Sequence, residues 1–100
     1  MIFSIKLTED ALNDMAGIVQ WYDTQKNNLG TIFIEHIDLV FISIERNPFS
    51  YTKFYKQVRK AALQKFPYII LFKLENNMAV VHAVFHTSRN PGNILKRLKR

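Results

Sequence analysis

The chain has 100 residues, of which 48% are hydrophobic, so we expect one folded domain spanning residues 1–100 rather than a disordered segment. It contains no cysteine, which excludes disulfides and thiolate metal sites and is typical of a reducing cytoplasm. The net charge of +6 is one-sided: residues 1–50 carry three basic and seven acidic side chains, whereas residues 51–100 carry eleven basic and one acidic. A basic half of this kind favours a polyanionic partner, either nucleic acid or an acidic protein segment.

The sequence gives no support for a membrane span or an export signal. Glu35, Asp38 and Glu45 interrupt the longest apolar stretch, which leaves no run long enough to cross a bilayer. The N-terminal segment MIFSIKLTED lacks a basic stretch followed by an apolar one, so we expect no secretory signal. We therefore expect a cytoplasmic protein with no membrane contact.

The N-terminal half predicts a strand followed by two helices. Residues 2–7 alternate in polarity, which predicts a strand with its odd-numbered side chains turned inward. Thr8 is a good N-cap, and the apolar spacing after it predicts a helix that ends near Gln25. A polar break with one glycine precedes a second helix, which begins at Leu29 or Gly30 and ends at Arg46 before Asn47-Pro48.

The second helix is apolar over more than one face. Such a helix packs under a sheet and also offers surface to a partner. Ile34 and Phe41 broaden this apolar face. Burial in the core is the first interpretation for both side chains, and contact with a partner is the second.

The C-terminal half predicts strands. Residues 54–63 read as one basic strand, and residues 66–74 and 78–87 form an antiparallel hairpin around a polar turn. The hairpin strands are apolar on both faces, so they belong in the middle of a sheet. Asn90-Pro91-Gly92 breaks the last strand, and residues 94–100 predict a short basic helix. The predicted order β-α-α-β-β-β is an α+β fold in which a helical hairpin packs on a small antiparallel sheet.

Cofactor and metal sites have no support in the sequence. The three glycines form no phosphate-binding loop. His82 and His86 are four residues apart on one predicted strand, so they share a face but lie roughly 13 Å apart and cannot bind one metal ion. We expect neither a cofactor nor a metal.

The chemistry that remains is cationic. We interpret seven basic residues as a surface for nucleic acid or another target: Lys56, Arg59, Lys60, Lys65, Arg89, Lys96 and Arg97. Cleavage of RNA by its own 2′-hydroxyl needs a base, an acid and cationic stabilisation, but no metal. The imidazole of His86 is suited to proton transfer near neutral pH, so a nuclease would use His86 with Arg59 and Arg89 as catalytic residues. The competing interpretation gives His86 a structural role, hydrogen-bonded to backbone at the strand end.

The chain resembles a known family over most of its length, from Phe3 to about Leu95. The order of elements, the run VRKAALQKFPYIILFKL and the hairpin segment AVVHAVFHTSRNP resemble the RelE/ParE superfamily of toxins from bacterial type II toxin–antitoxin systems. Members are also labelled plasmid stabilisation proteins. The resemblance implies a cognate antitoxin protein. We expect its acidic, amphipathic segment to bind the basic sheet and the helical hairpin, with Ile34, Phe41 and Tyr68 as contacts.

The resemblance implies two alternative targets. RelE-like members bind the ribosomal A site and cut mRNA with a basic cluster, to which Lys56, Arg59 and Arg89 would correspond. ParE-like members inhibit DNA gyrase by binding alone. The sequence has an aromatic residue, Tyr68, near the position of an expected arginine, and no Tyr or His follows Arg89. His86 lies at the end of the last predicted strand, and a histidine at this position resembles the ParE-like branch. We favour gyrase inhibition, with the ribosome-dependent endoribonuclease second and an inactive relative that only binds antitoxin third.

Overall fold

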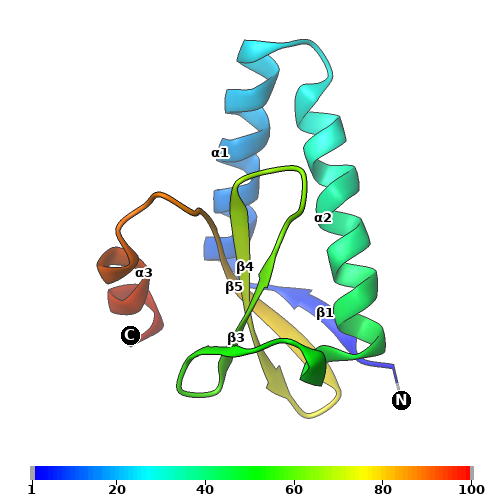
Figure 1. The fold of residues 1–100 in the computed structure, drawn as a ribbon, viewed down its shortest axis with the longest axis vertical. Helices are drawn as coiled ribbons and strands as arrows, with labels where there is room; N and C mark the ends of the chain where they lie inside the picture. Colours follow the sequence, from blue (N-terminus) through cyan, green and yellow to red (C-terminus); the bar gives the residue numbers. More distant parts are fainter. Residues whose placement is uncertain (1, 100) are drawn as a thin grey trace.

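The computed structural model describes residues 2–99 (Figure 1). Its elements in chain order are β1 (Ser4–Leu7), α1 (Glu9–Gln25), α2 (Leu29–Arg46), the 3-10 turn η1 (Pro48–Ser50), β2 (Lys53–Tyr55), β3 (Val58–Ala62), β4 (Tyr68–Glu75), β5 (Met78–His86) and α3 (Pro91–Leu98). The long helices form a hairpin on one side of the sheet, and α3 is not part of this hairpin (Figure 1). The predicted α+β fold with a helical hairpin is confirmed.

The five strands form one sheet in the order β1-β5-β4-β3-β2. The predicted hairpin is confirmed, because β4 and β5 pair antiparallel through the Asn76-Asn77 turn. The predicted antiparallel pairing holds from β2 to β5, whereas β1 pairs parallel to β5. The chain between these parallel neighbours runs through both long helices and then through β2, β3 and β4.

The predicted basic strand over residues 54–63 is two strands rather than one. β2 and β3 pair antiparallel, with Lys53 opposite Arg59 and Tyr55 opposite Val58. The reversal depends on Lys56, which adopts a positive φ of 50°. Side-chain patterning could not reveal this turn, because lysine at positive φ is uncommon and the segment contains neither glycine nor proline.

The helical hairpin packs on what we call the helix face of the sheet. Thr8 caps α1 as predicted, its hydroxyl accepting a hydrogen bond from the Ala11 N–H at 3.1 Å. The main core lies between α1, α2 and this face, and its largest fully buried side chains include Phe33, Phe72 and Ile37. Gly30 lies at the start of α2, where an added Cβ would come within 2.7 Å of the Val19 side chain, so only glycine allows this approach of the two helices.

The opposite side of the sheet, which we call the α3 face, is covered by α3. Asn90 caps this helix, accepting a hydrogen bond from the Gly92 N–H at 2.8 Å. Ile94 is 1% exposed and packs in a second core cluster with Leu71 and Phe85. The helix begins at Pro91, earlier than predicted. The burial of Ile94 holds it against the sheet.

A β-bulge in β5 overturns the prediction that His82 and His86 share a face. Leu71 pairs with Ala83 and Phe72 with Val81, so His82 is an extra residue on β5. An inserted residue inverts the alternation of side chains beyond it. His82 consequently lies on the α3 face beside Arg97, whereas His86 lies on the helix face beside Trp21 and Tyr22.

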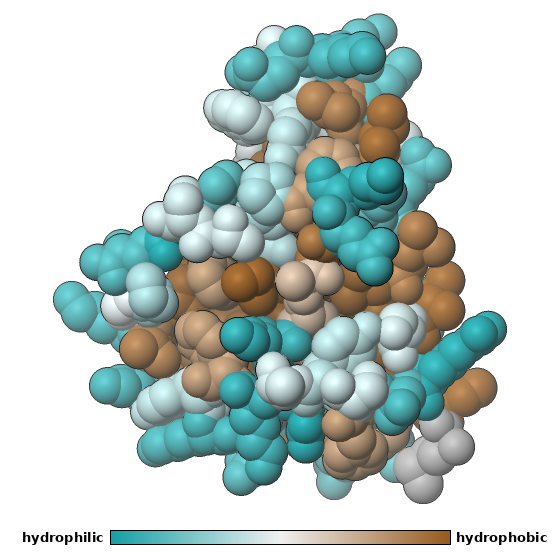
Figure 2. All heavy atoms as spheres, in the orientation of Figure 1, coloured by the Kyte–Doolittle hydropathy of each residue, from teal (hydrophilic) through white to brown (hydrophobic). Residues whose placement is uncertain are grey.

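Figure 2 shows hydrophobic side chains along the right-hand side of the molecule, where Figure 1 places α2. The exposed large hydrophobic residues on α2 are Ile32, Leu39 and Ile42. None of the helices within residues 2–99 is both long and apolar enough to cross a membrane.

Candidate functional site: the basic surface around the sheet

Arg59 projects from β3 on the helix face, opposite Phe72 of β4. Its guanidinium donates a hydrogen bond of 2.7 Å to the Tyr51 carbonyl and lies 5.4 Å from the centroid of the Phe49 ring. Arginine combines both contacts readily, because its planar cation stacks on aromatic rings while its N–H groups bind carbonyls. Arg59 is therefore half-buried against the η1 segment.

His86 ends β5 and pairs with Tyr68 of β4. Its Nδ1 accepts a hydrogen bond of 3.0 Å from the Ser88 backbone N–H and lies 2.8 Å from the Ser88 hydroxyl. Because Nδ1 accepts the hydrogen bond from this N–H, the proton of the neutral imidazole lies on Nε2. The ring also packs edge-on against Tyr68, with the centroids 5.2 Å apart. These contacts agree with the interpretation in which His86 has a structural role at the strand end.

The three proposed catalytic residues do not form one group. Arg59 is opposite Phe72 and His86 is opposite Tyr68, so they lie on different neighbours of β4 and four residues apart along it. Strand spacing and rise then separate their Cα atoms by roughly 16 Å. Arg89 is exposed and borders the same cleft as His86, so the structure brings these two together and leaves Arg59 apart.

The lysines of the predicted target surface are exposed and spread over several elements. Lys56 lies in the β2–β3 turn, Lys60 on β3, Lys65 in the β3–β4 loop and Lys96 on α3. The Lys56 ammonium group lies 5.5 Å from the centroid of the Tyr55 ring. These four residues remain predicted target contacts.

Arg97 differs from the lysines because its charge is already paired. It donates hydrogen bonds to both carboxylate oxygens of Asp14, at 2.7 and 3.1 Å, and one of 3.3 Å to the His82 carbonyl. Bonding to Asp14 raises the pKa of the Arg97 guanidinium, so it stays protonated. Its predicted role as a target contact therefore competes with an internal ion pair.

Asp14 is a structural residue that the sequence did not reveal. Its carboxylate also accepts a hydrogen bond of 3.0 Å from the Val84 N–H of β5. β1 ends at Leu7, opposite Val81, so the part of β5 beyond it has no strand on that side. Asp14 and Arg97 bind this open edge of β5 and connect α1 to α3. The sequence could have pointed to this role only through an acidic residue on the inner side of a helix, because the hydrogen-bond partners of Asp14 are 70 and 83 residues away.

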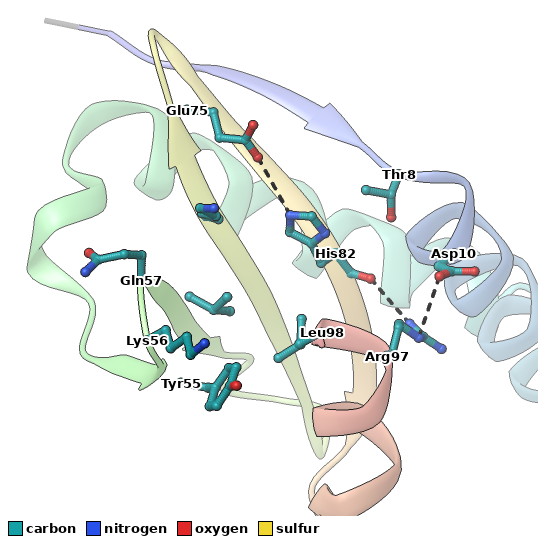
Figure 3. Close-up of a pocket in the computed structure, with 11 residues that line it drawn as sticks. Thr8, Asp10, Tyr55, Lys56, Gln57, Glu75, His82, Arg97 and Leu98 are labelled. Carbon is teal, nitrogen blue, oxygen red and sulfur yellow. Dashed lines mark hydrogen bonds and ion pairs between the residues drawn. The ribbon is translucent and has the colours of Figure 1, made fainter. Parts of the chain in front are cut away.

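A pocket of about 540 Å³, which we call the α3 pocket, lies between α3, the β2–β3 turn and the α3 face (Figure 3). It is lined by Thr8, Asp10, Tyr55, Lys56, Gln57, Val58, Lys73, Glu75, His82, Arg97 and Leu98. Burial lowers the pKa of His82, Glu75 raises it and Lys73 lowers it, with a net decrease, so the ring is neutral near pH 7. The sequence did not predict this pocket, because the bulge that turns His82 toward it is invisible in the residue pattern.

The three predicted antitoxin contacts differ in their accessibility. Tyr68 is 9% exposed and lies in the aromatic core with Tyr22 and Phe33. Burial raises the pKa of the Tyr68 hydroxyl, so it is neutral near pH 7. Ile34 and Phe41 are half-buried against the main core, and Ile34 also lines a groove of about 680 Å³ between α1 and α2. Contact of these residues with an antitoxin stays a prediction.

Metal binding has no built site in the part of the chain that the structure describes. Across residues 2–99, no three His, Cys, Asp or Glu side chains come close enough to hold a metal ion. The basic residues can bind anions through charge and hydrogen bonds, and that is the chemistry this surface offers.

Two solved structures have a similar fold, and both come from toxin–antitoxin systems. A chromosomal ParDE system from P. aeruginosa aligns with a TM-score of 0.77 at 14% identity, over 87% of this chain and 98% of that one. The RelBE2 toxin–antitoxin complex from Mycobacterium tuberculosis aligns with a TM-score of 0.60 at 13% identity, over 86% of this chain and 99% of that one. At these identities the likeness concerns the fold alone.

The family follows from the sequence itself. The profile of the ParE toxin of the type II toxin–antitoxin system parDE matches residues 5–91, and the chain belongs to this family. It is a toxin of the type II toxin–antitoxin class. A comparison with curated proteins found no significant match. The match ends at Pro91, where α3 begins.

Proposed function

We propose that this toxin inhibits DNA gyrase by binding it and catalyses no reaction itself. The separation of Arg59 from His86 and Arg89 carries the proposal. Metal-independent RNA cleavage needs its base, acid and cations around one phosphate, within hydrogen-bond reach. Here the Cα atoms of Arg59 and His86 are roughly 16 Å apart, the Arg59 guanidinium is hydrogen-bonded to the Tyr51 carbonyl, and the Nδ1 of His86 is hydrogen-bonded to Ser88. Membership of the ParE toxin family supports the same conclusion.

We further propose that a cognate antitoxin neutralises the toxin in the cytoplasm, where gyrase acts. Its acidic segment would be steered by the basic C-terminal half of the chain. Both similar structures come from toxin–antitoxin systems, which supports a protein partner of this kind. The helical hairpin is itself acidic, so an acidic segment fits the α3 face better than the outer side of α1 and α2.

The test measures two activities of the same purified toxin. Supercoiling of relaxed plasmid by gyrase with ATP is followed on agarose gels, and cleavage of a reporter mRNA is followed in a cell-free translation system. We expect inhibited supercoiling with accumulation of cleaved DNA, and intact mRNA. His86→Gln should weaken inhibition only in part, because the imidazole is a local structural contact.

The opposite result identifies the alternative. Cuts in translated mRNA, lost in His86→Gln and in Arg89→Ala, would refute the proposal in favour of a ribosome-dependent endoribonuclease. A toxin without effect on either reaction, and without effect on growth when induced, would refute both in favour of an inactive relative that only binds antitoxin.

A further inference from the structure

The α3 pocket carries a concentration of cations that the protein itself leaves unneutralised. Within residues 2–99, Lys56, Lys73 and Lys99 form no ion pair with a carboxylate. The ammonium groups of Lys56 and Lys99 lie 5.5 and 6.0 Å from the centroid of the Tyr55 ring. Lys56 and Lys73 line the pocket from a turn and a strand, and Lys99, which follows α3, lies near the same Tyr55 ring; like charges placed this close repel one another.

The wall of the pocket also holds an unused polar atom. The Nε2 of His82 has no hydrogen-bond partner among the described residues and is shielded from solvent, with the nearest Glu75 oxygen 3.9 Å away. A buried polar group without a partner costs free energy. A bound group that supplies a hydrogen bond there gains stability without breaking an existing bond. Figure 3 shows the imidazole between Glu75 and the α3 helix, on the wall opposite Lys56.

The rest of the lining indicates what kind of anion fits. Glu75 and Asp10 place carboxylates on the same walls, and Val58 and Leu98 are apolar. A nucleic acid strand presents a regular row of phosphate charges, which these carboxylates would repel. A peptide presents carboxylates together with N–H donors and apolar side chains, which match the lysines, the acids and the apolar positions at once.

We propose that the α3 pocket binds an acidic segment of a protein partner, with a carboxylate side chain of that segment seated between Lys56 and Lys73. The aliphatic part of the segment packs on Leu98 and Tyr55, and its backbone N–H groups face Glu75. Within the proposed function this partner is the antitoxin, and that identification rests on it. The pocket itself does not depend on gyrase, so its test can fail while gyrase inhibition holds.

The experiment is an NMR titration of the ¹⁵N-labelled full chain with synthetic peptides. The probe is an acetylated decapeptide with Glu at every second position and Leu and Ser between. Two comparison ligands are the same peptide with Gln in place of Glu, and a thymidine decanucleotide. We expect the acidic peptide to shift the His82 imidazole signals and the amide signals of residues 55–58 and 73, and the Gln peptide to leave them unchanged.

Matched charge variants separate a site from a general charge effect. Lys56→Gln/Lys73→Gln should weaken binding of the acidic peptide about tenfold, which is about 1.4 kcal/mol shared between two ion pairs of exposed lysines. Lys26→Gln/Arg46→Gln removes the same charge at exposed positions of the helical hairpin and should change affinity less than twofold. The amide spectra of both variants report whether the fold is intact.

Three outcomes overturn the proposal. Equal weakening by both double variants would reduce the effect to net charge. Tighter binding of the decanucleotide at the same signals would make the pocket a nucleic acid site. Shifts confined to the groove between α1 and α2, with the α3 pocket signals unchanged, would place the acidic segment elsewhere. His82→Leu gives a second check, because it removes the unused nitrogen and should weaken the peptide complex while the free protein stays folded.

Discussion

The link between α1, β5 and α3 makes Asp14 the most informative single position for stability. Asp14→Ala removes a charged acceptor from the Val84 N–H and leaves the Arg97 guanidinium without its bidentate partner. The Asp14 and Arg97 side chains are 12% and 19% exposed, so water replaces these bonds only in part. A lost bond to a charged acceptor costs about 1.5–3 kcal/mol, and the largely buried guanidinium, left with Asp10 at 3.9 Å and the His82 carbonyl, adds to it. We expect a loss of ~3 kcal/mol.

The assay is urea unfolding of the wild type, Asp14→Ala, Arg97→Ala and the double variant, with thermal melting alongside. A loss of ~3 kcal/mol lowers the Tm of a domain of this size by roughly 12 °C or more. Arg97→Ala keeps the hydrogen bond from Val84 to Asp14. The double-mutant cycle should therefore give a coupling free energy of about 1–2 kcal/mol between Asp14 and Arg97. Asp38→Ala, an exposed acid on α2, should change stability by less than ~0.5 kcal/mol. Additive effects, or a loss below ~1 kcal/mol for Asp14→Ala, would refute the link.

Three other predictions test the packing, the histidine and the arginine. Gly17→Ala should raise stability by about 0.5–1 kcal/mol, because a Cβ added there meets nothing within 4 Å. Gly30→Ala should lower stability by ~2 kcal/mol, because its Cβ clashes between α1 and α2. Thermal melts that rank the two variants the other way would contradict the helix packing. The pKa of His82 is below its ordinary value of 6.5, mainly through burial, so the unfolded chain binds the proton more tightly. The stability that this group contributes is therefore full above pH 6.5 and is lost as the pH falls below it. The free energy of unfolding of His82→Gln should fall less between pH 7 and pH 5 than that of the wild type. An equal pH dependence of the two unfolding free energies, measured by urea titration, would disprove the assignment. Arg59→Ala should cost about 1 kcal/mol through the Tyr51 carbonyl and the Phe49 ring, and an unchanged midpoint would show that both contacts are without weight.

Much of the fold follows from local patterns that act within a few residues. The Thr8 cap, the end of α1 at Gln25 and the end of α2 at Arg46 were all readable, because capping and helical spacing depend on neighbours in sequence. The hairpin of β4 and β5 was readable for the same reason. The sequence missed the β2–β3 turn, because Lys56 adopts a conformation that its residue type disfavours.

The candidate site was predictable only as a set of residue types. The one-sided charge predicted a basic surface, and the basic residues do border the sheet and α3. Their grouping was not predictable, because it depends on strand order and on the face to which each side chain points. Arg59 and His86 fall on different neighbours of β4, and the bulge at His82 separates the two histidines that alternation placed together.

The sequence by itself determined the fold class, the toxin family and the sign of the surface charge, because each depends on composition, short-range periodicity or a long matched segment. Only the tertiary structure decided which cations are free and which are paired. Arg97 and Lys56 are alike in the sequence, yet Arg97 is bound to Asp14 across 83 residues of chain while Lys56 faces an open pocket. Such pairings depend on distances set by packing of remote segments, which no local pattern encodes.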